Sequence, residues 1–296
     1  MAFTETKSQS TTVRKPLDCF MLQIDQLHFS IHSTPILQNL SFKLNDGEIV
    51  GFVGNNGAGK TTTLEIISQC ISPTNGRITW NEEDIWASNS YRKSMGYVPD
   101  QLPLYPNATV RENLLYTANL RQLQDPQLRV DELIEEFKLS SVSLSPIRTL
   151  SKGWRQWTGL AQAWCNTPKL LLLDEPTSGL DPSGRQRFDS WLRRIRDEGT
   201  TVFFSSHILS EVEAVSDRVL WIEDGRLIEG NDLIWTIQCV VEHPDPAIKK
   251  TIQSIDGLTD IQIEGNSITL CCHPNTRPKV AQSLIEFGLL EMRRIR

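Results

Sequence analysis

The sequence contains no long run of apolar residues. Its densest run, Leu170 to Leu173, is far shorter than the roughly 20 apolar residues that a membrane-spanning helix needs. Residues 1–18 are rich in Ser, Thr and Lys and lack the apolar segment that a secretory signal requires. We therefore expect a chain that stays inside the cell without crossing a bilayer, and a flexible tail at residues 1–20.

An excess of positive charge is also missing. The 296 residues include 30 Lys and Arg against 36 Asp and Glu, which gives a formal net charge of −6. Such a chain has no overall positive field with which to hold a polyanion. A nucleic-acid partner is therefore not expected.

Cysteine is scarce, and none of the six forms a paired C-x-x-C with metal-ligand spacing. Disulfide bonds are therefore not expected to hold the fold together. Cys271, Cys272 and His273 are adjacent, which suggests a metal site, but neighbouring residues of a strand point to opposite faces and do not converge on one ion. We interpret these cysteines as buried thiols.

The hydrophobic pattern that is present predicts an α/β domain. Alternation and short apolar runs predict strands at residues 21–29, 36–44, 48–53, 77–80, 169–174 and 200–205. Helical periodicity predicts helices at residues 61–69, 110–121, 128–137, 152–165 and 183–198. The two opening strands should be antiparallel, whereas the later alternation of strands with helices indicates a mostly parallel sheet.

A glycine-rich loop lies between a predicted strand and a predicted helix. Residues 54–61 fit the phosphate-loop pattern G-x-x-x-x-G-K-[ST] in the structural context that this motif requires. The glycines let backbone N–H groups curl around phosphate oxygens, Lys60 should reach the β and γ phosphates, and Thr61 offers a hydroxyl to Mg²⁺. The expected nucleotide-binding residues of the loop are Gly54, Asn55, Asn56, Gly57, Ala58, Gly59, Lys60, Thr61 and Thr62.

Two carboxylates at the end of an apolar strand supply the second half of such a site. Asp174 and Glu175 come directly after Leu173, at the carboxyl end of this strand, where an α/β sheet places its ligands. Asp174 should hold Mg²⁺, directly or through water, and Glu175 should polarise the attacking water. By themselves the two residues would be a solvated strand end, but the upstream phosphate loop favours a catalytic role.

Three further motifs accompany the phosphate loop and the carboxylates. They are Leu150-Ser151-Lys152-Gly153-Trp154, Ser178-Gly179-Leu180-Asp181 and Ser205-Ser206-His207. This ordered set, within about residues 21–235, resembles the ATP-binding cassette family, and an ordered set is far more specific than one motif.

The resemblance implies roles for residues outside the phosphate loop. In that family two subunits pair head to tail, so Ser151 and Gly153, at the start of a helix, would face the γ-phosphate held by the other subunit. His207 would contact the γ-phosphate in its own subunit, and Asp181 would belong to the D-loop beside the nucleotide. Without the resemblance, Ser151 would be interpreted as a helix cap and His207 as a core histidine.

The chain departs from the family pattern at three places. Lys152 and Trp154 make the signature more cationic and bulkier than the usual LSGGQ. After Gly-Tyr-Val-Pro the family has a glutamine that links Mg²⁺ and water to the membrane partner, and this chain has Asp100 and then Gln101. Both are therefore candidate catalytic residues, and Asp100 is also a candidate metal ligand. Ile31 stands where the family often stacks an aromatic residue on adenine.

The resemblance implies an ATP-binding and ATP-hydrolysing subunit of a transporter of the exporter-type branch. Its cofactors would be ATP and Mg²⁺, and its partners a separate membrane permease and a second ATP-binding subunit, in a homodimer or a heterodimer. It would lie on the cytoplasmic side of the membrane, attached through the permease. The alternatives are a soluble cassette ATPase and a regulatory nucleotide-binding module, and the intact Glu175 and His207 argue against the second.

The expected fold is a P-loop NTPase cassette with an antiparallel β subdomain, at residues 21–236. A helical insertion is expected within it, at about residues 85–166. After Gly230 the pattern changes to strand, helix, strand, strand, helix, strand. We interpret residues 237–296 as a small α+β accessory domain.

Overall fold

The computed structural model describes residues 20–228, 235–243, 245, 247–255, 258–272 and 276–294. The chain forms two compact units, Met1–Leu227 and Ile228–Arg296. Nearly all of the expected tail lies outside the described residues, and the boundary between the units precedes the limit that the sequence suggested. Within the described part of the chain, none of the helices combines the length and the apolar character needed to cross a membrane.

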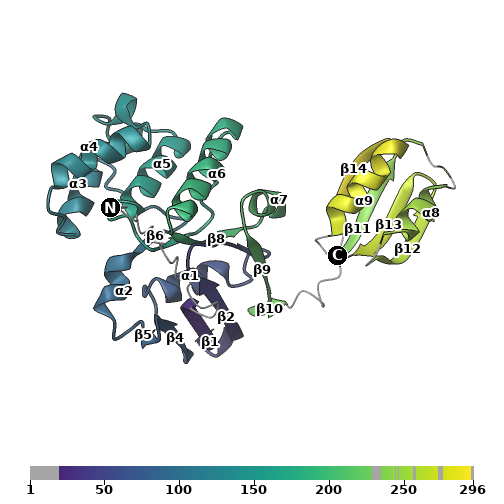
Figure 1. The fold of residues 1–296 in the computed structure, drawn as a ribbon, viewed down its shortest axis with the longest axis horizontal. Coiled ribbons are helices and arrows are strands. Elements are labelled where there is room, and N and C mark those ends of the chain that lie inside the picture. The colour runs from purple at the N-terminus through teal and green to yellow at the C-terminus, as the bar shows by residue number, and fades with distance from the viewer. Residues whose placement is uncertain are drawn as a thin grey trace, which may run out of the picture. The chain divides into compact units, whose positions relative to one another are not determined.

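The first unit is built around a six-stranded sheet with the strand order β10-β9-β3-β8-β7-β6 (Figure 1). Its strands are β3 (Ile49–Val53), β6 (Met95–Val98), β7 (Leu170–Leu173), β8 (Thr201–Ser206), β9 (Arg218–Glu223) and β10 (Arg226–Ile228). Strands β6, β7, β8, β3 and β9 pair in parallel, as predicted. The carboxyl ends of β3, β7 and β8 therefore meet at one edge of the sheet.

An antiparallel sheet with the order β2-β1-β4-β5 packs against the central sheet. Its strands are β1 (Phe20–Ile31), β2 (Thr34–Asn45), β4 (Asn75–Trp80) and β5 (Glu83–Asp84). Phe42 from β2 meets Phe52 from β3 and Phe203 from β8, with ring centroids 5.1 to 6.3 Å apart. The two sheets thus share one apolar core, and the predicted opening pair of antiparallel strands is confirmed.

Helices flank the central sheet, and the predicted ones lie within a few residues of their expected positions. The helices are α1 (Lys60–Ile67), α2 (Asn89–Ser94), α3 (Val110–Leu120), α4 (Pro126–Glu136), α5 (Lys152–Ala163), α6 (Pro182–Asp197) and α7 (Leu209–Glu213), with 3₁₀ turns η1 (Ser140–Val142) and η2 (Ile147–Thr149). Thr109 and Glu112 form a capping box that fixes the start of α3. Figure 1 shows α3, α4 and α5 on the same side of the first unit, and α3 contacts both α4 and α5.

The helical insertion expected at about residues 85–166 needs a correction. Strand β6 lies inside this range, after the short helix α2, and pairs with β7 in the central sheet, so the uninterrupted helical part begins only at α3. A four-residue strand is too short to show a period. Gly96 also breaks its apolar run, because the strand packs so closely on α5 that a Cβ there would lie 2.4 Å from the carbonyl oxygen of Ala163.

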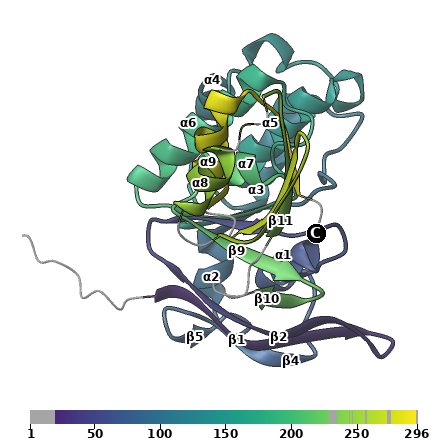
Figure 2. The ribbon, with the colours of Figure 1, turned by 90° about the vertical axis from the view of Figure 1, so that its right-hand side faces the viewer.

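The second unit is a βαββαβ fold with the sheet order β12-β13-β11-β14, all described pairs being antiparallel. Its elements are β11 (Trp235–Val241), α8 (Ala247–Gln253), β12 (Leu258–Glu264), β13 (Ser267–Cys272), α9 (Arg277–Leu284), η4 (Ile285–Phe287) and β14 (Leu289–Arg294). Figure 2 shows α8 and α9 next to each other along this sheet. The order of elements is the one that the sequence predicted.

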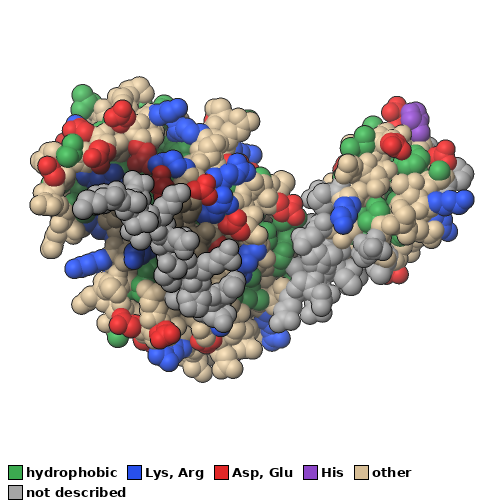
Figure 3. Space-filling model, in the orientation of Figure 1, with side chains coloured by type: hydrophobic (Ala, Val, Ile, Leu, Met, Phe, Trp, Pro, Cys, Tyr) green, Lys and Arg blue, Asp and Glu red, His purple; other side chains and the backbone are tan. Residues whose placement is uncertain are grey.

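The adjacent cysteines of β13 lie on opposite faces of the second unit's sheet. Cys272 is buried and Cys271 is half-buried, in step with the alternation along the strand. His273 lies outside the described residues. In the part of the chain that is described, no cluster of three His, Cys, Asp or Glu side chains has a geometry suited to a metal ion. Figure 3 shows Lys and Arg side chains interspersed with Asp and Glu over the visible face of the first unit.

Candidate active site

The phosphate loop connects the carboxyl end of β3 to the start of α1. Gly59 is the N-cap of α1 and has a φ of 106°, in the left-handed region that glycine adopts without strain. A Cβ on Gly54 would lie 2.3 Å from the carbonyl oxygen of Ile222, so the neighbouring strand β9 leaves no room for a side chain there. Glycine is therefore required at both positions of a loop that leads directly into the N-terminus of α1, an arrangement suited to phosphate oxygens.

Lys60 is buried inside this loop. Its Nζ donates hydrogen bonds to the carbonyl oxygens of Gly54, at 2.8 Å, and Asn55, at 3.2 Å, and lies 3.8 Å from Oε1 of Glu175. Burial lowers the pKa of Lys60, and the nearby carboxylates of Glu175 and Asp174 oppose this effect. The loop thus holds the Lys60 ammonium close to the candidate carboxylates of Asp174 and Glu175.

Asp174 follows β7 and is 1% exposed. Its Oδ1 accepts a hydrogen bond of 2.5 Å from Ser205 Oγ at the end of β8. Its Oδ2 is buried and has no hydrogen-bond partner within the described residues. A buried carboxylate oxygen without a partner is costly, and oxygen is the ligand that Mg²⁺ prefers. Asp174 is therefore suited to be a metal ligand, and the exposed Thr61 in the first turn of α1 can offer a second oxygen.

Glu175 lies between two basic side chains. Its Oε2 is 2.8 Å from Nδ1 of His207, and its Oε1 faces Lys60. The backbone of Glu175 has a φ of 46°, a left-handed conformation that is uncommon for a residue with a side chain, and its N–H donates to Ser205 Oγ at 3.0 Å. Strained backbone of this kind gathers at functional sites. The structure thus brings Lys60, Asp174, Glu175 and His207 together, as the motifs led us to expect.

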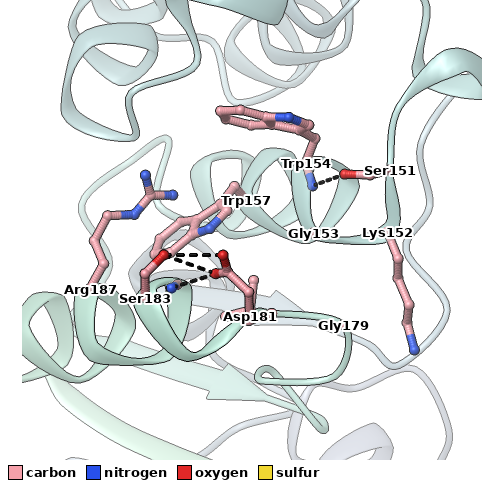
Figure 4. Close-up of a pocket in the computed structure, with 11 residues that line it drawn as sticks. Ser151, Lys152, Gly153, Trp154, Trp157, Gly179, Asp181, Ser183 and Arg187 are labelled. Carbon is pink, nitrogen blue, oxygen red and sulfur yellow. Dashed lines mark hydrogen bonds between the residues drawn. The ribbon is translucent and has the colours of Figure 1, made fainter.

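A second site lies at the starts of α5 and α6, where a pocket of about 430 Å³ opens (Figure 4). Ser151 caps α5 and accepts a hydrogen bond from the backbone N–H of Trp154 at 3.4 Å. Asp181 caps α6 and accepts one from Gly184 at 2.7 Å. The cap expected as the alternative for Ser151 is therefore real, and the same residue also lines the pocket together with Gly153.

Asp100 and Gln101 are exposed, in the segment that follows β6. Asp100 lines a different pocket, of about 330 Å³, beside Arg148, Lys152 and Arg155. Neither residue forms a hydrogen bond to Asp174 or Glu175 among the contacts of the described chain. Their catalytic and metal-binding roles stay predictions. Ile31, at the end of β1, is 50% exposed.

Motif reading gave no role to Tyr97 and Ser205, although both are part of quoted motifs. The Tyr97 hydroxyl is buried without a hydrogen-bond partner in the described part of the chain. Burial raises the pKa of Tyr97, and the carboxylates of Asp174, Glu65 and Asp100 raise it further. Tyr97 is therefore a neutral hydroxyl within electrostatic reach of Asp174 and Asp100, two of the candidate metal ligands. No local sequence pattern predicts that Tyr97 or Ser205 lies near Asp174, because the strands that carry these residues are far apart in the sequence.

Comparisons with known proteins agree with this arrangement. Residues 37–178 match the family described as ABC transporter. The chain is 38% identical to "Uncharacterized ABC transporter ATP-binding protein YdbJ" of Bacillus subtilis (strain 168) over 257 residues, which cover 83% of this chain and 80% of that protein. It is 34% identical to "Lantibiotic transport ATP-binding protein SrtF" of Streptococcus pyogenes over 208 residues, which cover 70% of this chain and 89% of that protein. The solved "Structure of ATP binding subunit of ABC transporter" superposes with a TM-score of 0.64 at 28% identity, covering 70% of this chain and 88% of that one.

Proposed function

This chain belongs to the ABC transporter family of ATP-binding proteins. We propose that it binds ATP at the phosphate loop and hydrolyses it with Glu175 as the proton acceptor. The observation that carries the proposal is the position of Glu175, whose two carboxylate oxygens face Lys60 at 3.8 Å and His207 at 2.8 Å. A carboxylate held between a phosphate-binding cation and a histidine is suited to accept a proton from water beside a terminal phosphate.

In this proposal the backbone of residues 54–62 and the Lys60 ammonium bind the triphosphate. Thr61 and the unpartnered Oδ2 of Asp174 would hold Mg²⁺, which would supply positive charge to the phosphate oxygens. Glu175 accepts the proton of the attacking water, and His207 orients the Glu175 carboxylate through their hydrogen bond. Asp100 would be a further metal ligand, and Gln101 a side chain that positions water, both in the exposed segment that follows β6.

We further propose that two ATP-binding subunits, identical or different, close head to tail. Ser151, Gly153 and Asp181 of one subunit then face the nucleotide of the other, since they line a pocket formed by two helix N-termini. Closure and hydrolysis drive export through a separate permease, with the subunit on the cytoplasmic side of the membrane. The domain limits proposed from the sequence are a tail at 1–20, the cassette at 21–236 and an accessory domain at 237–296, which places the boundary after the division between the compact units at Leu227 and Ile228.

Two variants separate binding from hydrolysis. Lys60→Ala should abolish tight ATP binding, because the triphosphate loses its main cation. Glu175→Gln should keep ATP binding and lower phosphate release by about 10²- to 10⁴-fold, since the proton acceptor is lost. The blocked Glu175→Gln protein should also accumulate as an ATP-bound dimer on size-exclusion chromatography. Glu135→Gln, an exposed carboxylate on α4, is the matched control and should behave like the wild type.

Either of two results would contradict the proposal. If Glu175→Gln hydrolysed ATP at the wild-type rate, another group would activate the water. If Lys60→Ala kept the wild-type nucleotide affinity, the phosphate loop would not be the binding site. A wild type that releases no phosphate even with its permease would instead favour a regulatory module.

A further inference from the structure

Helix α6 carries five arginines, and four of them have a partner. Arg185 pairs with Glu211 at 2.8 Å and Arg196 with Asp217 at 2.8 Å. Arg193 donates to the carbonyl oxygen of Ala214 at 2.6 Å, and Arg194 pairs with Glu136. Arg187 has no carboxylate within ion-pair distance in the described part of the chain. It is therefore the exception on its helix and calls for a different explanation.

The Arg187 guanidinium lies on the face of an aromatic ring. Its Cζ is 3.5 Å from the centroid of the Trp157 ring, and its Nε is buried without a hydrogen-bond partner among the described residues. Burial lowers the pKa of Arg187, an effect that the nearby Asp181 carboxylate opposes. A guanidinium stacked on tryptophan is held in one orientation while its planar fork of N–H donors stays usable.

Several groups around the pocket beside this guanidinium would favour an anion. Figure 4 shows Arg187 and Trp157 on one wall and Ser151 and Lys152 on the opposite side. The N-termini of α5 and α6 both open here, and their dipoles favour negative charge. Asp181, the carboxylate of the lining, already accepts hydrogen bonds from Gly184 and Ser183. Lys152 already donates to Ser178 at 2.6 Å, whereas the Nε of Arg187 has no acceptor among the described residues.

We propose that Arg187 binds a phosphate oxygen of the ATP held by the phosphate loop of the partner subunit. The inference rests on the head-to-tail pairing proposed above and adds a side-chain cation to the hydroxyl and N–H groups of the signature. A guanidinium supplied across an interface stabilises charge on a transferring phosphoryl group without belonging to the site that binds the nucleotide. Arg187 thereby makes each nucleotide site depend on charge from the other subunit.

Loss of this cation should show in ATP turnover. Arg187→Gln should lower phosphate release by roughly 10- to 100-fold, the range for a charge-assisted hydrogen bond. Arg187→Lys keeps the charge without the planar fork and should retain part of the turnover. Arg194→Gln, on the same helix but paired with Glu136 outside the pocket, is the control for helix stability and should hydrolyse ATP like the wild type. Circular dichroism of each variant verifies that it is folded.

Mixed dimers test whether Arg187 acts across the interface. Differently tagged Lys60→Ala and Arg187→Gln subunits are co-expressed and purified through both tags. One composite site then has an intact phosphate loop and an intact Arg187 from the other subunit, so turnover should reappear well above the sum of the two variants alone. A parallel dimer of Lys60→Ala with Ser151→Ala tests the head-to-tail pairing by itself.

The two mixed dimers give distinguishable failures. Recovery with Ser151→Ala but not with Arg187→Gln would overturn the role of Arg187 in the partner's site and leave the pairing intact. If neither mixed dimer recovered ATP turnover, the head-to-tail pairing would be overturned and, with it, the role of Arg187. Wild-type turnover in Arg187→Gln homodimers would also reject the proposal, because it would show that Arg187 does not stabilise charge on the phosphate during hydrolysis.

Discussion

Ser205 Oγ donates a 2.5 Å hydrogen bond to Oδ1 of Asp174 and accepts one of 3.0 Å from the backbone N–H of Glu175. One hydroxyl at the end of β8 thus ties down both carboxylates that follow β7. It occupies Oδ1 of Asp174 and leaves the buried Oδ2 for another partner. It also fixes the left-handed turn at Glu175 that directs this side chain between Lys60 and His207.

Ser205→Ala should therefore weaken the metal site more than the fold. Loss of a buried hydrogen bond to a charged group costs about 1–3 kcal/mol, and Asp174 would lose the bond that holds its orientation. We expect ATP turnover to require a roughly tenfold higher Mg²⁺ concentration, because loss of a hydrogen bond to a metal ligand typically weakens metal binding by at least this factor. The measurement is phosphate release against Mg²⁺ concentration.

Ser206→Ala is the matched control for this experiment. Ser206 is also buried at the end of β8, but its Oγ accepts from the backbone N–H of Ile208 and not from the carboxylate segment. Its removal should lower stability while leaving the Mg²⁺ dependence as in the wild type. An unchanged Mg²⁺ dependence in Ser205→Ala would show that Asp174 is oriented by something else.

The contact between Ser205 and Asp174 shows where sequence interpretation ends. The motifs predicted that Lys60, Asp174, Glu175 and His207 would meet, because a phosphate loop and a strand-end carboxylate have few other ways to be arranged. The hydroxyl that links them comes from a different strand, and nothing near Ser205 in the sequence announces its partner. Pairing of Arg187 with Trp157 was equally hidden, since it joins two helices through side chains alone.

The fold was predictable to a similar degree. Long periodic segments such as α5 and α6 and the element order of the second unit followed from the sequence. Short elements did not: β6 contains Gly96, and β9 is only partly buried, so neither has a clear period. These strands exist because their neighbours β7 and β3 supply hydrogen-bond partners, which is a tertiary effect.

Gly179 should be intolerant of alanine because of its contact with Lys152. A Cβ at Gly179 would lie 2.6 Å from Cγ and Cδ of Lys152, and the φ of 87° strains any side chain. Gly179→Ala should push Lys152 out of its hydrogen bond with Ser178 and separate the starts of α5 and α6. In the Glu175→Gln background, we expect less ATP-dependent dimer on size-exclusion chromatography.

Gly199→Ala is the control that introduces backbone strain without a clash against Lys152. Gly199 has a similar φ of 98°, but a Cβ there would meet nothing within 4 Å. Gly199→Ala should therefore lower folding stability through backbone strain and leave ATP-dependent dimer formation unaffected. Adding Lys152→Ala to Gly179→Ala removes the clashing stem and should restore part of the folding stability that Gly179→Ala loses. Equal effects of the two glycine variants on the dimer would reject the contact as the cause.

Glu48 should make the first unit acid-sensitive. It stands just before β3 and forms a two-pronged ion pair with Arg218 of β9, at 2.8 Å and 3.0 Å, and it also accepts a bond of 2.6 Å from the backbone N–H of Asn45. Burial raises the pKa of Glu48, but the bonds from Arg218 and Asn45 outweigh it, so the pKa lies below its ordinary value. The Glu48 carboxyl group thus binds its proton less tightly in the folded protein than in the unfolded chain.

The sign of the pH effect follows from that difference. Because the folded pKa is lowered, the stabilisation by Glu48 is complete above the ordinary glutamate pKa of about 4.3 and is lost as the pH falls through the lowered value. Glu48→Gln should therefore cost about 1–3 kcal/mol in free energy of unfolding near pH 7, and the gap to the wild type should close in acid. Urea titrations between about pH 3 and pH 7 measure it.

Tryptophan fluorescence is the suitable signal, because all of the eight tryptophans except Trp235 precede Ile228 and so report the first unit. Glu135→Gln, exposed on α4, serves as the control and should show no gap at any pH. A gap for Glu48→Gln that stayed constant down to the lowest pH would mean that the variant loses packing and not charge. Since Glu48 and Arg218 link the loop before β3 to β9, the strand against which Gly54 packs, a closing gap would also show that acid loosens the support of the phosphate loop.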